Sequence, residues 1–171
     1  MKKKVFAILL SFLCIFGATC FAKNPNATRL PHERMALGGL HFADTMEYVQ
    51  SIYGEPDNQK SGYSQETDSD YAIWEYGGSV KIYFGKNVND GEYYIQIIRV
   101  TKDNGFATPD GIKVGTDLKT LKQTYGTPAF QPSSKTGDGQ YRYNNDVYSH
   151  IHFLFQVKNG RVSSIGLGIN N

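Results

Sequence analysis

The chain has 171 residues, 40% of them hydrophobic and 20% charged, and its formal net charge is +2. Three of the 18 basic residues, Lys2, Lys3 and Lys4, stand at the N-terminus, and the 15 that remain are balanced by 16 acidic residues. A chain with this balance has no basic field that would favour nucleic acid or an anionic membrane surface.

Residues 1–22 have the form of a secretory signal peptide. The N-terminal lysines precede the apolar run VFAILLSFLCIFGATCFA, and the small residues Cys20 and Ala22 predict cleavage after Ala22. We therefore expect a secreted, periplasmic or envelope protein. A retained membrane anchor and lipidation at Cys20 are the alternatives, although an apolar run of about 18 residues is marginal for a membrane span. Because Cys14 and Cys20 both lie in this segment, the mature chain is expected to contain no cysteine, disulfide or thiolate metal site.

The remainder of the chain contains two segments of similar sequence. We expect an N-terminal tether at 23–38, a first repeat unit at 39–105 and a second at 106–171. GLHFADTMEYVQSIYGEP (39–56) aligns without a gap with GIKVGTDLKTLKQTYGTP (111–128), and the apolar positions coincide. A repeat of this length predicts one supersecondary unit used twice.

Each copy begins with a predicted helix. Asp44 and Thr116 are the expected N-caps, and Asp44 with Glu47 resembles a capping box. The helical spacing places one apolar stripe on each helix: Met46, Val49 and Tyr53 in the first, Leu118, Leu121 and Tyr125 in the second.

The motif Tyr-Gly-x-Pro is predicted to end both helices. Gly54 and Gly126 supply the left-handed residue of a C-terminal cap, and the prolines that follow, Pro56 and Pro128, prevent the helix from resuming. The repeated motif is therefore a structural signal and not a catalytic one.

Three strands are expected after each helix. Polar loops at 57–70 and 131–139 come first. The predicted strands are 71–76, 79–84 and 93–100 in the first unit, and 140–144, 149–155 and 162–169 in the second. Asp90-Gly91 and Asn159-Gly160 predict hairpin turns between the last two strands of each unit.

These elements predict an α+β fold of two tandem helix-plus-three-strand units that form one antiparallel sheet. Both helices cover one face, and the other face is left open, as antiparallel sheets allow. Alternation along the strands places the following side chains under the helices: Trp74, Tyr76, Val80, Ile82, Phe84, Tyr141, Tyr143, Ile151, Phe153 and Phe155.

The sequence resembles two known families. A helix, Gly-x-Pro and then an aromatic-x-Tyr strand, WEY at 74–76 and YRY at 141–143, is similar to the unit of the SmpA/OmlA (BamE) outer-membrane lipoproteins. Two such units in tandem resemble the beta-lactamase inhibitor protein fold. These resemblances imply a concave sheet and a role in binding a partner protein. The chain departs from both families, because it lacks the inhibitor's disulfides and carries two units where the lipoproteins carry one.

Motifs for catalysis are not found. The sequence has no Gly-x-Ser-x-Gly, His-Glu-x-x-His or phosphate-binding glycine loop. The acidic run 66–70 lacks the glycine and distal glutamate of a calcium loop, so a solvated loop is the better interpretation. His150 and His152 would point the same way on a strand and could share a metal, but no third ligand is evident. We expect no cofactor and no resident metal.

The open face is the predicted site. Its partner-binding residues are expected to be Tyr71, Glu75, Tyr83, Arg99, Arg142, Tyr148, His150 and His152, together with aliphatic positions such as Ile73, Ile95, Ile97 and Leu154. Aromatic side chains mixed with arginine are typical of binding hot spots. The sequence thus favours an exported, non-enzymatic module that binds an envelope assembly component or a hydrolase to be inhibited. A module for cell-wall glycan and a metal-dependent enzyme built on the histidine pair are the alternatives.

Overall fold

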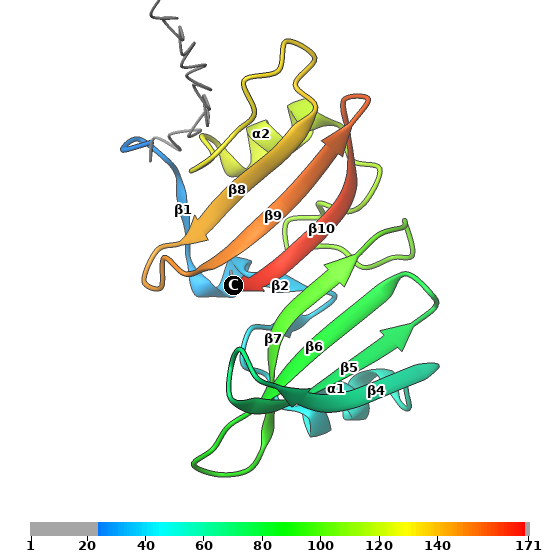
Figure 1. Cartoon of the computed structure of the whole chain (residues 1–171). Helices are drawn as coiled ribbons and strands as arrows, with labels where there is room; N and C mark the ends of the chain where they lie inside the picture. The colour runs from blue at the N-terminus through cyan, green and yellow to red at the C-terminus, as the bar shows by residue number, and fades with distance from the viewer. Residues whose placement is uncertain (1–23, 170–171) are drawn as a thin grey trace, which may run out of the picture.

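The computed structural model describes residues 24–169, and the predicted signal peptide with Cys20 lies outside these residues. The described chain has a mixed α+β fold dominated by one sheet with strand order β1-β8-β9-β10-β7-β6-β5-β4 (Figure 1). The strands are β1 (Arg29–Leu30), β4 (Asn58–Ser64), β5 (Ser69–Tyr76), β6 (Val80–Lys86), β7 (Tyr93–Val100), β8 (Gly139–Asn145), β9 (Ile151–Lys158) and β10 (Arg161–Ile169).

The α+β class is confirmed, but the organisation into two units of one helix and three strands is not. The eight strands form a single sheet, because β10 pairs directly with β7 from Ile165↔Val100 to Gly168↔Ile97. The sheet is also not wholly antiparallel, since the short β1 pairs in parallel with β8. The chain folds around one continuous layer rather than as two separate modules.

The two helices begin one residue later than predicted. In α1 (Met46–Tyr53) the N-cap is Thr45, whose side chain accepts a hydrogen bond from the Tyr48 N–H. In α2 (Leu118–Tyr125) the N-cap is Asp117, which accepts from the Thr120 N–H. Asp44 makes no capping box, because its carboxylate accepts from the His41 N–H at 2.7 Å instead. Thr116 lies outside the helix and its hydroxyl accepts from the Lys113 N–H.

The helix ends agree with the sequence prediction. Gly54 and Gly126 are the C-caps, with φ of 71° and 72°, and each donates its N–H to a carbonyl in the last turn. Val49, Leu121 and Tyr125 of the predicted stripes are buried against the sheet. The Tyr-Gly-x-Pro motif therefore ends both helices, as expected from the conformational freedom of glycine.

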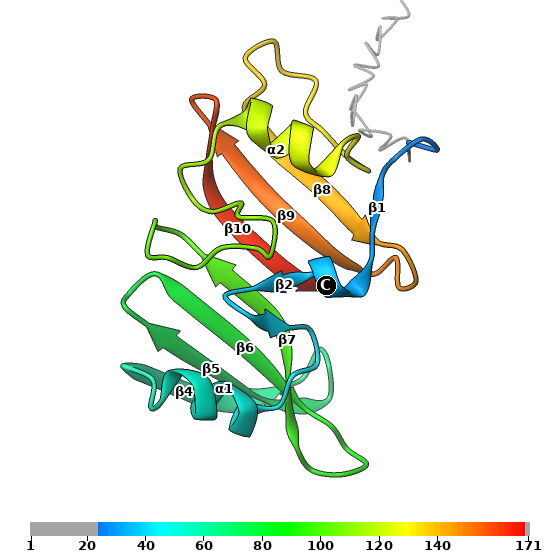
Figure 2. The same ribbon diagram turned by 180° about the vertical axis from the view of Figure 1, so that it is seen from behind.

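One face of the sheet carries both helices and the whole hydrophobic core. Figure 2 shows α1 and α2 on the same side, with the N-terminal segment lying between them. The strand residues predicted to face the helices are buried, except that Tyr76 is only partly buried. Aromatic rings fill much of this layer. Trp74 packs edge-on against Phe84 with ring centroids 5.2 Å apart, and the centroids of Tyr125 and Tyr143 are 5.4 Å apart.

The segment expected to be a tether is part of the fold. It forms β1, the 3-10 helix η1 (His32–Arg34) and β2 (Ala36–Leu37), which pairs with the following β3 (Leu40–His41) in a small second sheet. Three of its apolar side chains, Leu30, Met35 and Leu37, are buried in the core, as is Leu40 of β3. Its strands are two residues long, too short to show a period, and this explains why the sequence pattern did not predict them.

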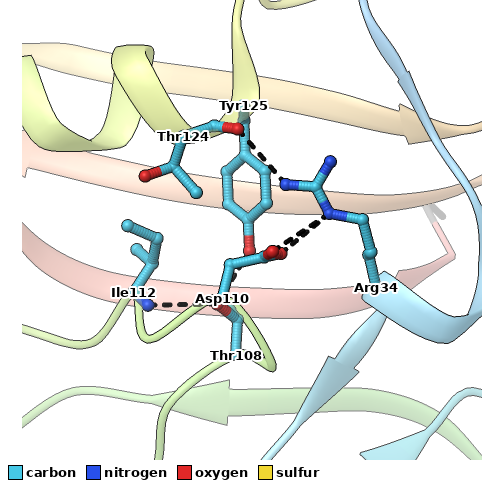
Figure 3. A network of polar contacts seen from close by, with 6 residues as sticks. All are labelled: Arg34, Thr108, Asp110, Ile112, Thr124 and Tyr125. Atoms are coloured by element: carbon cyan, nitrogen blue, oxygen red, sulfur yellow. Dashed lines mark hydrogen bonds and ion pairs between the residues drawn. The ribbon is translucent and has the colours of Figure 1, made fainter.

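Arg34 ties this segment to α2 (Figure 3). Its Nε lies 3.0 Å from Asp110 Oδ2, its Nη2 donates to the Thr124 carbonyl, and its guanidinium stacks 5.1 Å from the Tyr125 ring. The Tyr125 hydroxyl in turn donates to Thr108 Oγ1, which also accepts from the Ile112 N–H. The network fixes the N-terminal segment, the turn at 108–112 and the end of α2 against one another.

Two further differences concern the strands. The predicted polar loop at 57–70 contains the edge strand β4, whose side chains are mostly exposed and so lack hydrophobic alternation. In β7 a bulge places Phe84 opposite Ile95 and Tyr83 opposite Ile97. Ile95 is consequently buried under the helices and not on the open face, because the extra residue reverses the alternation.

Among residues 24–169 no helix is long and apolar enough to cross a membrane.

Candidate functional site

The face of the sheet opposite the helices is the candidate site, and we call it the open face. Register assigns its residues, since directly paired residues share a face. They include Asn58, Lys60 and Gly62 of β4; Tyr71, Ile73 and Glu75 of β5; Lys81, Tyr83 and Gly85 of β6; Tyr94, Ile97 and Arg99 of β7; Ser164, Gly166 and Gly168 of β10; His152, Leu154 and Gln156 of β9; Gln140, Arg142 and Asn144 of β8; and Arg29 of β1.

A first hollow, which we call the tyrosine pocket, lies over β5, β6 and β7. It has a volume of about 710 Å³, and its lining includes Tyr71, Tyr83, Tyr94, Ile97 and Ile169. A hydrogen-bonded rim closes one end, where Lys86 Nζ lies 3.2 Å from Asp70. The pocket offers aromatic and aliphatic surface to a side chain or a ring from outside.

A second hollow, the arginine pocket, adjoins the first over β7, β10 and β9. It has a volume of about 590 Å³ and is lined by Arg99, His152, Leu154, Gln156, Ile97 and Ile169, among others. Ile97 and Ile169 line both hollows, so the two adjoin each other across the sheet. Ser164, Gly166 and Gly168 of β10 carry small side chains or none, which keeps this part of the face low.

The charges of the open face are only partly paired. Lys81 Nζ lies 2.6 Å from Glu75 Oε1 on the neighbouring strand, and this hydrogen bond raises the pKa of Lys81. On its other side Lys81 stands directly opposite Arg99. Arg99 is exposed and has no ion pair within residues 24–169. Glu75 is therefore engaged within the sheet, whereas Arg99 is available to a ligand.

Two polar atoms at the β8 end of the face lack a partner within the described chain. They are Nε of Arg142 and Oδ1 of Asn144, and both atoms are buried. Asn144 is 8% exposed and stands opposite His152, and Arg142 stands opposite Leu154. Buried polar atoms normally have hydrogen-bond partners, and residues 24–169 supply none for these two.

The predicted site residues do not all come together. Tyr71 and Tyr83 line the tyrosine pocket, Arg99 and His152 line the arginine pocket, and Glu75 and Arg142 lie on the same face. Tyr148 and His150 lie in the loop between β8 and β9, where their rings are tilted by 55° with centroids 5.9 Å apart.

The prediction that His150 and His152 point the same way on one strand is wrong. β9 begins at Ile151, so His150 lies in a turn and does not share the strand face with His152. His152 is 5% exposed, and its Nδ1 lies 3.0 Å from the His150 carbonyl oxygen. Residues 24–169 contain no group of three or more His, Cys, Asp or Glu side chains arranged to hold a metal ion.

Sequence reasoning missed several residues of the site. Tyr94 and Ile169 line the pockets, Lys60 adds a charge from the unpredicted edge strand, and Asn144 faces the open side. Strand parity from Arg142 to Asn144 was a signal that could have identified Asn144. No comparable signal existed for Tyr94, because its position depends on the bulge in β7.

Comparison of the chain with known protein families, curated proteins and solved structures finds no match. The resemblances to the outer-membrane lipoproteins and to the inhibitor fold therefore receive no support from these comparisons.

Proposed function

We propose that this chain is an exported, non-enzymatic binding module that recognises a partner protein through the open face. The partner is an envelope assembly component or a secreted hydrolase. The observation that carries the proposal is the pair of adjoining hollows on the open face, lined by tyrosine and isoleucine beside Arg99, which has no ion pair in the described chain. Buried aromatic anchors beside arginine are the composition of protein-binding hot spots.

The experiment compares two faces of the same molecule. The protein is immobilised and exposed to culture fluid and envelope extract of its native organism, and bound proteins are identified. One variant, Tyr83→Ala with Arg99→Ala and Arg142→Ala, alters the open face. The control, Tyr48→Ala with Ile52→Ala, removes side chains that are 46% and 45% exposed on α1, on the opposite side of the sheet.

The proposal expects a protein that binds the wild type and the α1 variant equally and loses at least about 10-fold in affinity for the folded open-face variant. A partner that binds the open-face variant undiminished would contradict the proposal and would move the search to the loops at 57–70 and 131–139.

A glycan-binding function is the second candidate. It is favoured by one observation, that three tyrosine rings, Tyr71, Tyr83 and Tyr94, line a single pocket. Flat aromatic rings stack on sugar rings through their apolar faces. Retention on insoluble cell wall that depends on Tyr83 and is abolished by soluble wall fragments would support the glycan function over the protein partner.

Export is part of the proposal and has its own test. The basic and apolar segment 1–22 supports cleavage after Ala22. The protein isolated from cells is expected to begin at Lys23. An N-terminus at Met1 or an acylated Cys20 would contradict soluble export.

A further inference from the structure

The open face is positively charged, although acidic residues outnumber basic ones in residues 24–169 as a whole. Its strand positions include the cations Arg29, Lys60, Lys81, Arg99 and Arg142, and the carboxylate Glu75. The remaining acidic side chains lie elsewhere, on the helices, in the turns or at the rim. A surface whose charge opposes that of its own chain is selective for partners of the opposite sign.

The arrangement of these cations is unfavourable in the isolated protein. Lys81 and Arg99 are directly opposite each other on β6 and β7, and like charges at facing positions weaken a sheet. Glu75 neutralises Lys81 at 2.6 Å, and Arg99 is left without a carboxylate among the described residues. A carboxylate from outside would relieve the repulsion that the sheet itself leaves unbalanced.

At the β8 end of the face, two buried polar atoms lack hydrogen-bond partners among the described residues, and this is a second, independent observation. The buried Nε of Arg142 needs an acceptor, and the buried Oδ1 of Asn144, on a side chain that is 8% exposed, needs a donor. An extended peptide segment carries both kinds of group, because its backbone has N–H donors and acidic side chains supply acceptors. Small phosphate or carboxylate ions would offer the acceptor alone.

We propose that the open face binds an acidic segment of its partner protein. One carboxylate of that segment lies over Arg99 in the arginine pocket, other polar groups of the segment lie at Arg142 and Asn144, and an apolar side chain fills the tyrosine pocket. This proposal rests on the proposed function, because it names the chemistry of the partner at the same site. The two hollows share Ile97 and Ile169, so one continuous segment can occupy both.

The test uses random 12-residue peptides displayed on phage and selected on the immobilised protein at low salt. Selected peptides are expected to carry net negative charge and at least one large apolar residue. Their dissociation constants are then measured for the acidic form and for a form in which each Asp and Glu is replaced by its amide. We expect the amide form to bind at least about 10-fold more weakly, since each charge-assisted contact contributes about one order of magnitude.

Two matched variants assign the contact to the open face. Arg99→Gln and Lys119→Gln each remove one exposed positive charge, but Lys119 lies on α2, on the opposite side of the sheet. The proposal expects about a 10-fold loss for Arg99→Gln and no change for Lys119→Gln. The peptide comparison does not require any variant to fold.

The outcomes separate the two proposals. The acidic segment would be contradicted if the selected peptides were neutral or basic, or if they still bound after amidation. If Tyr83→Ala weakened the binding of those same peptides, the open face would remain the binding site. Failure to enrich any peptide would overturn the acidic segment alone. Peptides whose binding is unchanged by both Arg99→Gln and Tyr83→Ala would count against the acidic segment and against the open face as the binding site.

Discussion

The two helix-ending glycines differ in one respect that can be measured. Gly54 and Gly126 both have positive φ, where an L-residue is strained by about 1–3 kcal/mol. A Cβ on Gly54 would meet nothing within 4 Å, whereas one on Gly126 would lie 2.6 Å from Thr28 Oγ1. That hydroxyl is held in place, because it accepts a hydrogen bond from the Thr127 N–H.

We therefore expect Gly126→Ala to cost more free energy of unfolding than Gly54→Ala, by about 1–2 kcal/mol. Urea denaturation of both variants measures the difference, and Gln123→Ala serves as a nearly neutral helix control. Equal losses for the two glycine variants would mean that Thr28 does not hold the end of α2.

Tyr76 makes the fold sensitive to alkaline pH. Burial raises its pKa to about 12, with Glu55 and Asp57 adding to the shift. Its hydroxyl donates to the Gly54 carbonyl at 3.0 Å, and the phenolate form cannot donate. Because the folded pKa lies above the ordinary value of 10.0, the contribution is complete below pH 10 and is lost as the pH rises toward about 12.

Thermal melts between pH 8 and 12 test this dependence. Tyr76→Phe is expected to flatten the alkaline decline of Tm, and Tyr148→Phe, at a residue that is 55% exposed, serves as the control. Burial also raises the pKa values of Tyr125 and Tyr143, so part of the decline should remain in Tyr76→Phe. An unchanged decline would exclude a contribution from Tyr76.

At the scale of an element, two consecutive residues of strand β6 lie on opposite faces of the sheet, one in the core and one in the candidate site. Phe84 is 1% exposed and packs against Trp74, whereas Tyr83 lines the tyrosine pocket on the other face. Phe84→Ala is expected to cost about 3–5 kcal/mol of stability. Tyr83→Ala is expected to cost about 1 kcal/mol from cross-strand contacts and to weaken partner binding. Denaturant unfolding measures both values, and similar losses would contradict the assignment of faces.

The elements that the sequence predicted are those with strong local signals. Both helices were identified from apolar spacing and from the glycines at their ends, and six strands were identified from alternation and turn residues. The N-caps were misplaced by one residue, because Asp44-Thr45 and Thr116-Asp117 each offer two capping side chains in succession. Here tertiary contacts such as that of Asp44 with the His41 N–H decide which one caps.

The elements that were missed lack such signals. β4 is an exposed edge strand, so its NQKSGYS sequence has no apolar alternation. The bulge in β7 leaves no trace in composition, yet it moves Ile95 into the core. The residues of the open face were predicted where strand alternation holds, and these include Tyr71, Tyr83 and Arg99. The prediction was wrong for His150, because the strand begins at Ile151, two residues later than the alternation suggested.

At the scale of the whole molecule, the pairing of β10 with β7 joins strands β4–β7 and strands β8–β10 into a single sheet. β10 and β7 are consecutive in the sheet but far apart in sequence, and their pairing runs from Ile165↔Val100 to Gly168↔Ile97. The buried core extends across this junction as one cluster. Unfolding is therefore expected to be a single transition, with Trp74 fluorescence and far-ultraviolet circular dichroism giving the same midpoint.

Gly168 controls how closely the junction can pack. A Cβ at this position would lie 2.1 Å from the Gln96 carbonyl oxygen, which belongs to the bulged part of β7. Gly166, two residues earlier on the same strand, would place a Cβ no closer than 3.8 Å to any atom. Gly168 also has a φ of 151°, where a side chain is strained, so its substitution meets both an unfavourable conformation and nearby backbone, whereas that of Gly166 meets neither.

Gly168→Ala is accordingly expected to destabilise the protein by about 3 kcal/mol or more, because backbone must separate to admit one methyl group. Gly166→Ala is expected to be neutral or stabilising by up to about 1 kcal/mol, since it restricts only the unfolded chain. Unfolding followed by Trp74 fluorescence, which reports on the β4–β7 part of the sheet, and by circular dichroism measures both variants. If Gly168→Ala melts like Gly166→Ala, with coincident midpoints, the continuity of the sheet does not depend on this close approach. A large loss confined to Gly168→Ala would show that the junction opposite the bulge holds the single sheet together.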